Sequence, residues 1–192
     1  MIFYKQEFKM KKLLAATLLF STIGVANAAT YTIDPHHTNA RFAVDHNETS
    51  TNIGGFFMLE GKVQFDDTKK TGAVDITIPM SKMNTGNPDF DKHILGEHPG
   101  FFDAIKFPEM RFVSKQFVFD GDKVKFVTGE LTMLGQTKPV ILTATKFNCY
   151  HNKMANKEAC GGDFKAKINP TEWGFKAPAE AKIKIQIEAF KD

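Results

Sequence analysis

The feature that most constrains the fold of this chain is an alternation of apolar and polar residues with a period of two, which recurs along most of its length. The clearest example is "AKIKIQIE" at residues 181–188, in which isoleucine alternates with lysine and glutamine. Such alternation is typical of a β-strand with one buried face, because successive side chains point to opposite sides of a sheet. Roughly eight or nine such segments occur at the spacing of an antiparallel sandwich or barrel. The chain is therefore predicted to be an all-β protein.

Turn signals between these segments indicate that neighbouring strands form hairpins. Asp120-Gly121-Asp122 is a tight-turn signal, and a second turn is predicted at Gly135. A short helix is predicted over residues 87–96, where acidic residues follow Asn87-Pro88 near the positive end of the helix dipole. A one-sided sheet must bury its apolar face, and sequential hairpins favour closure of the sheet on itself. Eight strands would form a barrel that is either filled by side chains or hollow enough for one small ligand. The periodicity leaves that choice open.

The first 28 residues have the order of a secretory signal peptide. Residues 9–12 carry three lysines, residues 13–25 are mostly apolar, and residues 26–28 read Ala-Asn-Ala. The apolar run is too short for the ~20 residues that span a bilayer. We expect cleavage after residue 28, a periplasmic location, and a single domain over residues 29–192.

The charge of the expected mature chain argues against a polyanionic partner. The leader holds four of the 25 basic residues and one of the 22 acidic residues, so 21 of each remain. A balanced chain without a basic stripe is not expected to bind nucleic acid.

Two cysteines, Cys149 and Cys160, lie close together in the sequence. Export places them in an oxidising compartment, where they are expected to form a disulfide. They are poor candidates for metal ligands, because no C-x-x-C motif or nearby histidine pair completes a site.

The sequence offers no recognisable catalytic constellation. Six histidines are present, but no H-E-x-x-H motif occurs, and His93 and His98 lack the spacing of a helical ligand pair. No G-x-S-x-G motif or phosphate-binding loop is found. Neither enzymatic activity nor a cofactor is therefore expected.

Phenylalanine is unusually abundant, with 19 residues in the whole chain. Without a polar tip, these rings must fill a core or line an apolar cavity. "HPGFFDAIKFPEMRF" at residues 98–112 concentrates four of them in a stretch that two prolines interrupt, so it cannot continue a central strand. We expect this segment to fold over an opening of the barrel.

Four blocks of the chain resemble a known family. They are "YTIDPHHTNARFAVDH" (31–46), "GGFFMLEGKVQF" (54–65), "DKHILGEHPGFFDAIKFPEMRF" (91–112) and "GELTMLGQTKPVIL" (129–142). In this order they resemble the YceI-like family of secreted polyisoprenoid-binding proteins. The resemblance implies an extended, lipocalin-like antiparallel β-barrel of eight strands that is hollow and holds a long isoprenoid, such as a polyprenyl phosphate or a quinone.

Three positions depart from the motifs of that family. An arginine that is usual before the D-x-H motif is Phe90 here, the L-T-x-[HN]-G motif has Leu134, and the R-x-x-[WF]-G motif begins with Pro170. The loss of cationic or polar groups favours a neutral headgroup over a pyrophosphate.

The candidate site residues fall into three sets. The inward-facing apolar residues form the candidate wall: Phe42, Val44, Phe57, Leu59, Val74, Ile76, Ile78, Met110, Phe112, Leu131, Met133, Val140, Leu142, Ile183, Ile185 and Ile187. The interrupted segment supplies the candidate lid: Phe101, Phe102 and Phe107. The polar candidates for the mouth and headgroup are His37, His46, Asp91, His93, Thr137 and Lys138. Buried hydrogen bonding is the alternative role for these polar residues, and for the histidines above all.

The expected function is therefore periplasmic binding, transport or sequestration of a long-chain isoprenoid, with no cofactor apart from the lipid. A carrier of fatty acids or fatty amides is one alternative. A metal-dependent hydrolase that uses the mouth histidines is another, and a third is a stress or adhesion factor with a filled barrel. The sequence leaves open whether the protein forms a homodimer.

Overall fold

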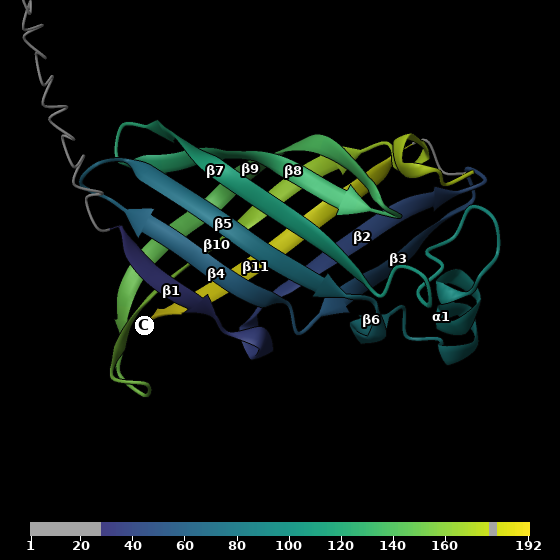
Figure 1. Cartoon of the computed structure of the whole chain (residues 1–192), viewed down its shortest axis with the longest axis horizontal. Coiled ribbons are helices and arrows are strands. Elements are labelled where there is room, and N and C mark those ends of the chain that lie inside the picture. The colour runs from purple at the N-terminus through teal and green to yellow at the C-terminus, as the bar shows by residue number, and fades with distance from the viewer. Residues whose placement is uncertain (1–27, 177–179) are drawn as a thin grey trace, which may run out of the picture.

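The computed structural model describes residues 28–176 and 180–192, which form one antiparallel sheet closed into a barrel (Figure 1). Eight strands make the closed ring: β1 (Ala29–Ile33), β4 (Glu60–Asp66), β5 (Thr71–Pro79), β7 (Glu109–Asp120), β8 (Lys123–Met133), β9 (Gln136–Asn152), β10 (Lys157–Ile168) and β11 (Ala181–Lys191). The predicted eight-stranded antiparallel barrel is confirmed. The predicted leader, apart from its last residue, lies outside the described residues.

Three further strands lengthen the wall of the barrel at one end: β2 (Asn39–His46), β3 (Ser50–Phe57) and β6 (Met83–Asn84). They attach through β11, whose first half pairs with β2 and whose last residues pair with β1. Short 3-10 helices connect several strands: η1 (Pro35–His37), η2 (Met80–Lys82) and η3 (Pro170–Trp173). The barrel is elongated, with α1 (Pro88–Leu95) near one end and the β9–β10 hairpin at the other (Figure 1).

The predicted helix is confirmed, and its ends follow from local chemistry. The Asn87 side chain accepts hydrogen bonds from the backbone N–H groups of Asp89 and Phe90, at 3.1 and 3.2 Å. Pro88 occupies the first turn, where a missing N–H group has no consequence. The segment after α1 is held against it, because Phe102 N–H donates to the carbonyl oxygen of Ile94 at 3.0 Å. This contact positions the phenylalanine-rich segment over the end of the barrel.

The predicted turns at residues 120–122 and at Gly135 are confirmed as the β7–β8 and β8–β9 connections. The prediction for Phe57 is wrong. Its side chain is 38% exposed on the outer face, whereas the adjacent Phe56 is buried. The cause is a turn at Met58, which has a φ of 56° and separates β3 from β4. The apparent period-two run from Phe57 to Leu59 therefore crosses two strands.

No helix in residues 28–176 and 180–192 is long and apolar enough to cross a membrane.

Candidate functional site

The inner face of the barrel encloses a cavity of about 500 Å³, which we call the barrel cavity. Apart from Phe57, every candidate wall residue lines it: Phe42, Val44, Leu59, Val74, Ile76, Ile78, Met110, Phe112, Leu131, Met133, Val140, Leu142, Ile183, Ile185 and Ile187. These residues alternate with outward-facing neighbours along the strands, so the period-two pattern places their side chains on one continuous inner surface. That surface is overwhelmingly aliphatic and aromatic.

Several phenylalanines that line the barrel cavity were not among the wall candidates: Phe56, Phe90, Phe117, Phe147, Phe164 and Phe175. Phe147 and Phe164 pack against each other, and Phe56 and Phe175 contact the lid. Phe102 packs edge-on against Phe56 and Phe175, with ring centroids 5.4 and 4.9 Å apart. The abundance of phenylalanine is the sequence signal that points to these residues. The apolar–polar alternation within a single strand does not identify all of them as lining residues.

Of the lid candidates, Phe101 and Phe102 line the cavity. The lid prediction is wrong for Phe107, whose ring does not line the cavity. Its ring lies against the β8–β9 turn, where a Cβ atom built on Gly135 would be 3.1 Å from the ring. The Lys106 ammonium lies 5.2 Å from the centroid of the same ring. Phe107 therefore fixes the return of the chain into β7 and does not cover the cavity.

Polar groups line the cavity from the β2–β3 hairpin and from α1, which lie at the same end of the barrel (Figure 1). Arg41, Asp45, His46, Asn52 and His93 contribute to the lining there, together with Asn47. Of the polar candidates, His46 and His93 therefore line the cavity. The His93 ring packs edge-on against Phe101 at 4.8 Å between centroids, which links the polar rim to the lid.

The other polar candidates lie away from the barrel cavity. Asp91 accepts hydrogen bonds from the backbone N–H and the hydroxyl group of Thr85, at 2.8 and 2.6 Å, and thereby ties α1 to the preceding loop. Thr137 is hydrogen-bonded to the Thr132 hydroxyl at 2.8 Å. Lys138 does not line the cavity. The mouth role predicted for these three residues is not supported by their positions.

His37 lies on the outside of the barrel, where it makes an ion pair with Asp34 at 2.6 Å. The hydrogen bond and charge of Asp34 raise the pKa of His37. Burial opposes ionisation of Asp34, but hydrogen bonds from His37 and from the backbone N–H of His36 keep its pKa below the usual range. Within the described residues, His37, Asp34 and Glu188 form the one group of three side chains suited to a metal ion. None of the three lines the barrel cavity.

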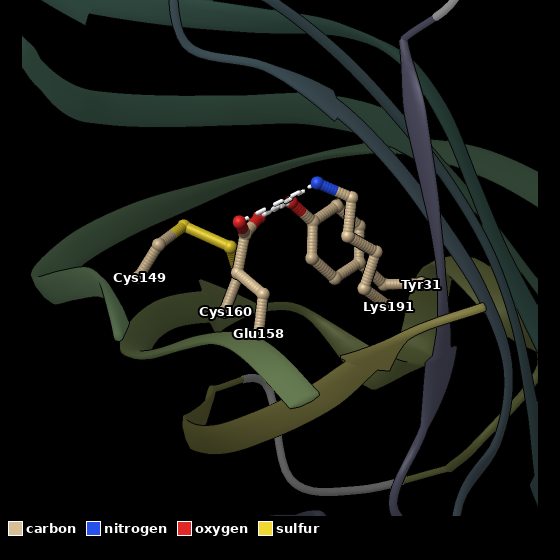
Figure 2. Close-up of a disulfide and its surroundings, with 5 residues drawn as sticks. All are labelled: Tyr31, Cys149, Glu158, Cys160 and Lys191. Atoms are coloured by element: carbon tan, nitrogen blue, oxygen red, sulfur yellow. Dashed lines mark hydrogen bonds and ion pairs between the residues drawn. A yellow bond between two sulfur atoms is a disulfide. The ribbon is translucent and has the colours of Figure 1, made fainter. Parts of the chain in front are cut away.

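The predicted disulfide is confirmed between Cys149 on β9 and Cys160 on β10 (Figure 2). Beside it, Tyr31 and Lys191 converge on the carboxylate of Glu158, as Figure 2 shows. The tyrosine hydroxyl donates a hydrogen bond to this carboxylate, and the lysine ammonium lies 3.4 Å from it. Burial, and then the hydrogen bond and charge of Glu158, raise the pKa of Tyr31 well above its usual value. These contacts join β1, β10 and β11 at the end of the barrel opposite α1.

Comparisons with known proteins return the same barrel fold. Residues 31–189 match the YceI-like domain. The chain belongs to the YceI-like family. A curated relative, a UPF0312 protein of Shewanella denitrificans, is 30% identical over 189 residues, which cover 93% of this chain and 94% of that protein.

Two solved structures share this fold. The crystal structure of the Campylobacter jejuni YceI protein superposes with a TM-score of 0.67 at 25% identity, covering 78% of this chain and 90% of that one. A domain of Saccharophagus degradans described as polyisoprenoid-binding superposes with a TM-score of 0.62, covering 85% of this chain and 99% of that one. Its identity is 10%, so this second likeness shows the fold alone.

Proposed function

We propose that this YceI-like protein binds a long-chain isoprenoid lipid in the barrel cavity and carries or sequesters it in the periplasm. The observation that supports the proposal most strongly is the apolar lining of a cavity of about 500 Å³. This volume lies within the range of roughly 300–1,000 Å³ that is usual for small-molecule sites. A water molecule occupies about 30 Å³ in the liquid, and a methylene group is of similar size, so the cavity has room for roughly 17 carbon atoms, or three to four isoprene units.

The tail of such a ligand would supply most of the affinity. Burial of roughly 17 methylene equivalents at about 0.8 kcal/mol each contributes about 14 kcal/mol before the costs of association. Those costs are of the order of 4–15 kcal/mol, and one charge-assisted headgroup contact adds only about 1.5–3 kcal/mol. Chain length should therefore affect affinity more than headgroup chemistry does.

The mouth favours a neutral headgroup, such as that of a prenol or a quinone. Arg41 and Asp45 both contribute to the rim, so their formal charges cancel. The two lining positions at which the family motifs usually carry arginine are occupied by Phe90 and Pro170. A pyrophosphate would instead need several converging cationic groups.

Two further observations support the proposal. The Saccharophagus degradans domain, which shares the fold, is described as polyisoprenoid-binding. The first 28 residues have the order of an export signal, which agrees with a periplasmic carrier. Fatty acids or fatty amides are the competing ligands, because an unbranched chain would bury similar apolar surface.

The test is to purify the full chain from the organism that produces it, extract the protein with organic solvent, and identify the released lipids by mass spectrometry. Total lipid from the same cells is the control, so that enrichment is measured and not mere abundance. We expect a prenyl lipid at close to one molecule per protein. Enrichment of a fatty acid or amide would overturn the ligand class, and recovery of no enriched lipid would overturn the carrier function.

A further inference from the structure

A second cavity, of about 550 Å³, lies at the end of the barrel opposite α1. Its lining differs in chemistry from that of the barrel cavity. Asp66, Asp67, Asp122, Glu158 and Lys191 all contribute to it. The Tyr31 hydroxyl, bonded to Glu158, also lies on its wall. The second cavity is therefore a polar, charged compartment, in contrast to the apolar barrel cavity.

The two cavities meet at a group of side chains that includes Phe147. Phe147 lines both cavities. Its ring packs against Phe65, which lines the second cavity, at 5.0 Å between centroids, and against Phe164, which lines the barrel cavity, at 6.5 Å. The disulfide belongs to the same group, since Cys160 faces the barrel cavity and Cys149 faces the second one. We call Phe147, Phe65 and this disulfide the partition.

The inward position of Phe147 results from an irregularity in β9. Lys146 pairs with Asp163, but Ala144 pairs with the next residue of β10, so Thr145 is a bulge with no partner across the ladder. An extra residue of this kind exchanges the two faces of a strand beyond it. The inner face of β9 therefore runs through Val140 and Leu142 and then passes to Phe147.

The strand opposite leaves space for the ring. Gly162 on β10 pairs with Phe147, and a Cβ atom at Gly162 would lie only 3.2 Å from the ring of Phe147. A side chain at this position would therefore compete with the ring for the same space. The bulge turns the ring inward, and the glycine leaves room for it.

We propose that Phe147 is the residue that limits how far a prenyl chain can enter the barrel, and that the partition thereby determines the chain length that is bound. This inference rests on the proposed function, because it assigns a specificity determinant to the same cavity. A chain that enters from the polar mouth passes along the apolar wall and meets the Phe147 ring. Beyond the ring, the acidic groups and Lys191 of the second cavity would lose hydration against a hydrocarbon chain. Longer chains must therefore leave their additional units outside the mouth.

The proposal predicts the effect of removing the ring. In a Phe147→Ala variant, the space vacated by the ring would extend the bore toward the apolar surfaces of Phe65 and Ala29. A longer chain could then bury about two additional methylene groups, which corresponds to roughly a tenfold gain in affinity. A chain too short to reach the partition would gain nothing.

The experiment compares the affinities of farnesol, geranylgeraniol and solanesol, delivered from cyclodextrin, by displacement of the fluorescent reporter N-phenylnaphthylamine. The quantity of interest is the ratio of solanesol affinity to farnesol affinity in each protein. We expect this ratio to rise about tenfold in Phe147→Ala relative to the wild type. The matched control is Phe126→Ala, which makes the same truncation on β8 at a ring that lines neither cavity. It should leave the ratio unchanged.

Each outcome has one meaning. The inference would be overturned if the ratio were unchanged in a folded Phe147→Ala variant, or if it rose equally in Phe126→Ala. In either case, prenol binding by the wild type would still support the proposed function. Failure of the wild type to bind any of the three prenols would contradict the proposed function itself. If thermal unfolding shows that Phe147→Ala is not folded, Phe147→Leu decides by the same criterion, because it keeps an apolar side chain and shortens it.

Discussion

A tryptophan introduced at Leu142 should block prenyl-chain binding while the barrel remains folded. Leu142 lines the barrel cavity from β9 and is 8% exposed. Tryptophan has about six more heavy atoms than leucine, and each would displace about one methylene group of the ligand. At about 0.8 kcal/mol per group the loss is about 5 kcal/mol, or more than a thousandfold in affinity. The new ring enters empty space, so the cost in stability should stay below the roughly 1–3 kcal/mol of an overpacked core.

The adjacent residue supplies a matched control. Ile141 is on the same strand, but its side chain is on the outer face and is 59% exposed. Ile141→Trp should therefore bind prenols as the wild type does. The assay is the affinity for geranylgeraniol, measured by reporter displacement, together with urea unfolding of each variant. Two results would refute the reasoning. One is unchanged binding by Leu142→Trp, and the other is loss of binding together with a loss of stability well above 3 kcal/mol, which would identify Leu142 as part of a filled core.

Three further predictions concern stability. Replacing Cys149 and Cys160 together by serine should lower the free energy of unfolding by about 3 kcal/mol, because the bridge joins residues 11 apart; equal urea midpoints for the variant and the oxidised wild type would contradict this. Because the pKa of Tyr31 is raised in the folded protein, its protonated hydroxyl contributes fully to the free energy of unfolding below a pH of about 10, the pKa of an unfolded tyrosine. This contribution is lost as the pH rises through the pKa that Tyr31 has in the folded protein. The melting temperature of Tyr31→Phe should therefore fall less than that of the wild type between neutral and strongly alkaline pH. Equal falls in the two proteins would exclude the Tyr31–Glu158 contact as the cause of the alkaline destabilisation. Gly61→Ala should destabilise the barrel by about 1–3 kcal/mol, because Gly61 has a φ of 146° and a Cβ atom would lie 2.1 Å from a carbonyl oxygen of β5; a thermal unfolding midpoint equal to that of the wild type would argue against strain at this position.

The wall of the cavity could be predicted from the sequence because alternation is a local property. Ile183, Ile185 and Ile187 lie on one face of β11 whatever the rest of the chain does, and closure of the sheet turns that face inward. The same logic fails wherever the register changes. The turn at Met58 separates Phe57 from the wall, and the bulge at Thr145 brings Phe147 into it. Neither change leaves a clear mark in the hydrophobic pattern.

The polar residues were harder to place, because their partners are distant in the sequence or depend on loop geometry. His37 is drawn to Asp34 by a 3-10 turn on the outside of the barrel, and Glu188 reaches the same group from the last strand. Asp91 is used to secure the N-terminal part of α1 to Thr85. A histidine or aspartate in a family motif could not be assigned to the mouth until the path of the chain around the barrel was known.

The most direct test of a ligand-bearing hollow barrel is a high-resolution crystal structure of the protein purified from the organism that produces it. The account predicts continuous, methyl-branched electron density that runs from the polar mouth along Leu142 to the ring of Phe147. An interior in which protein side chains meet across the axis, or which contains only ordered water, would contradict it.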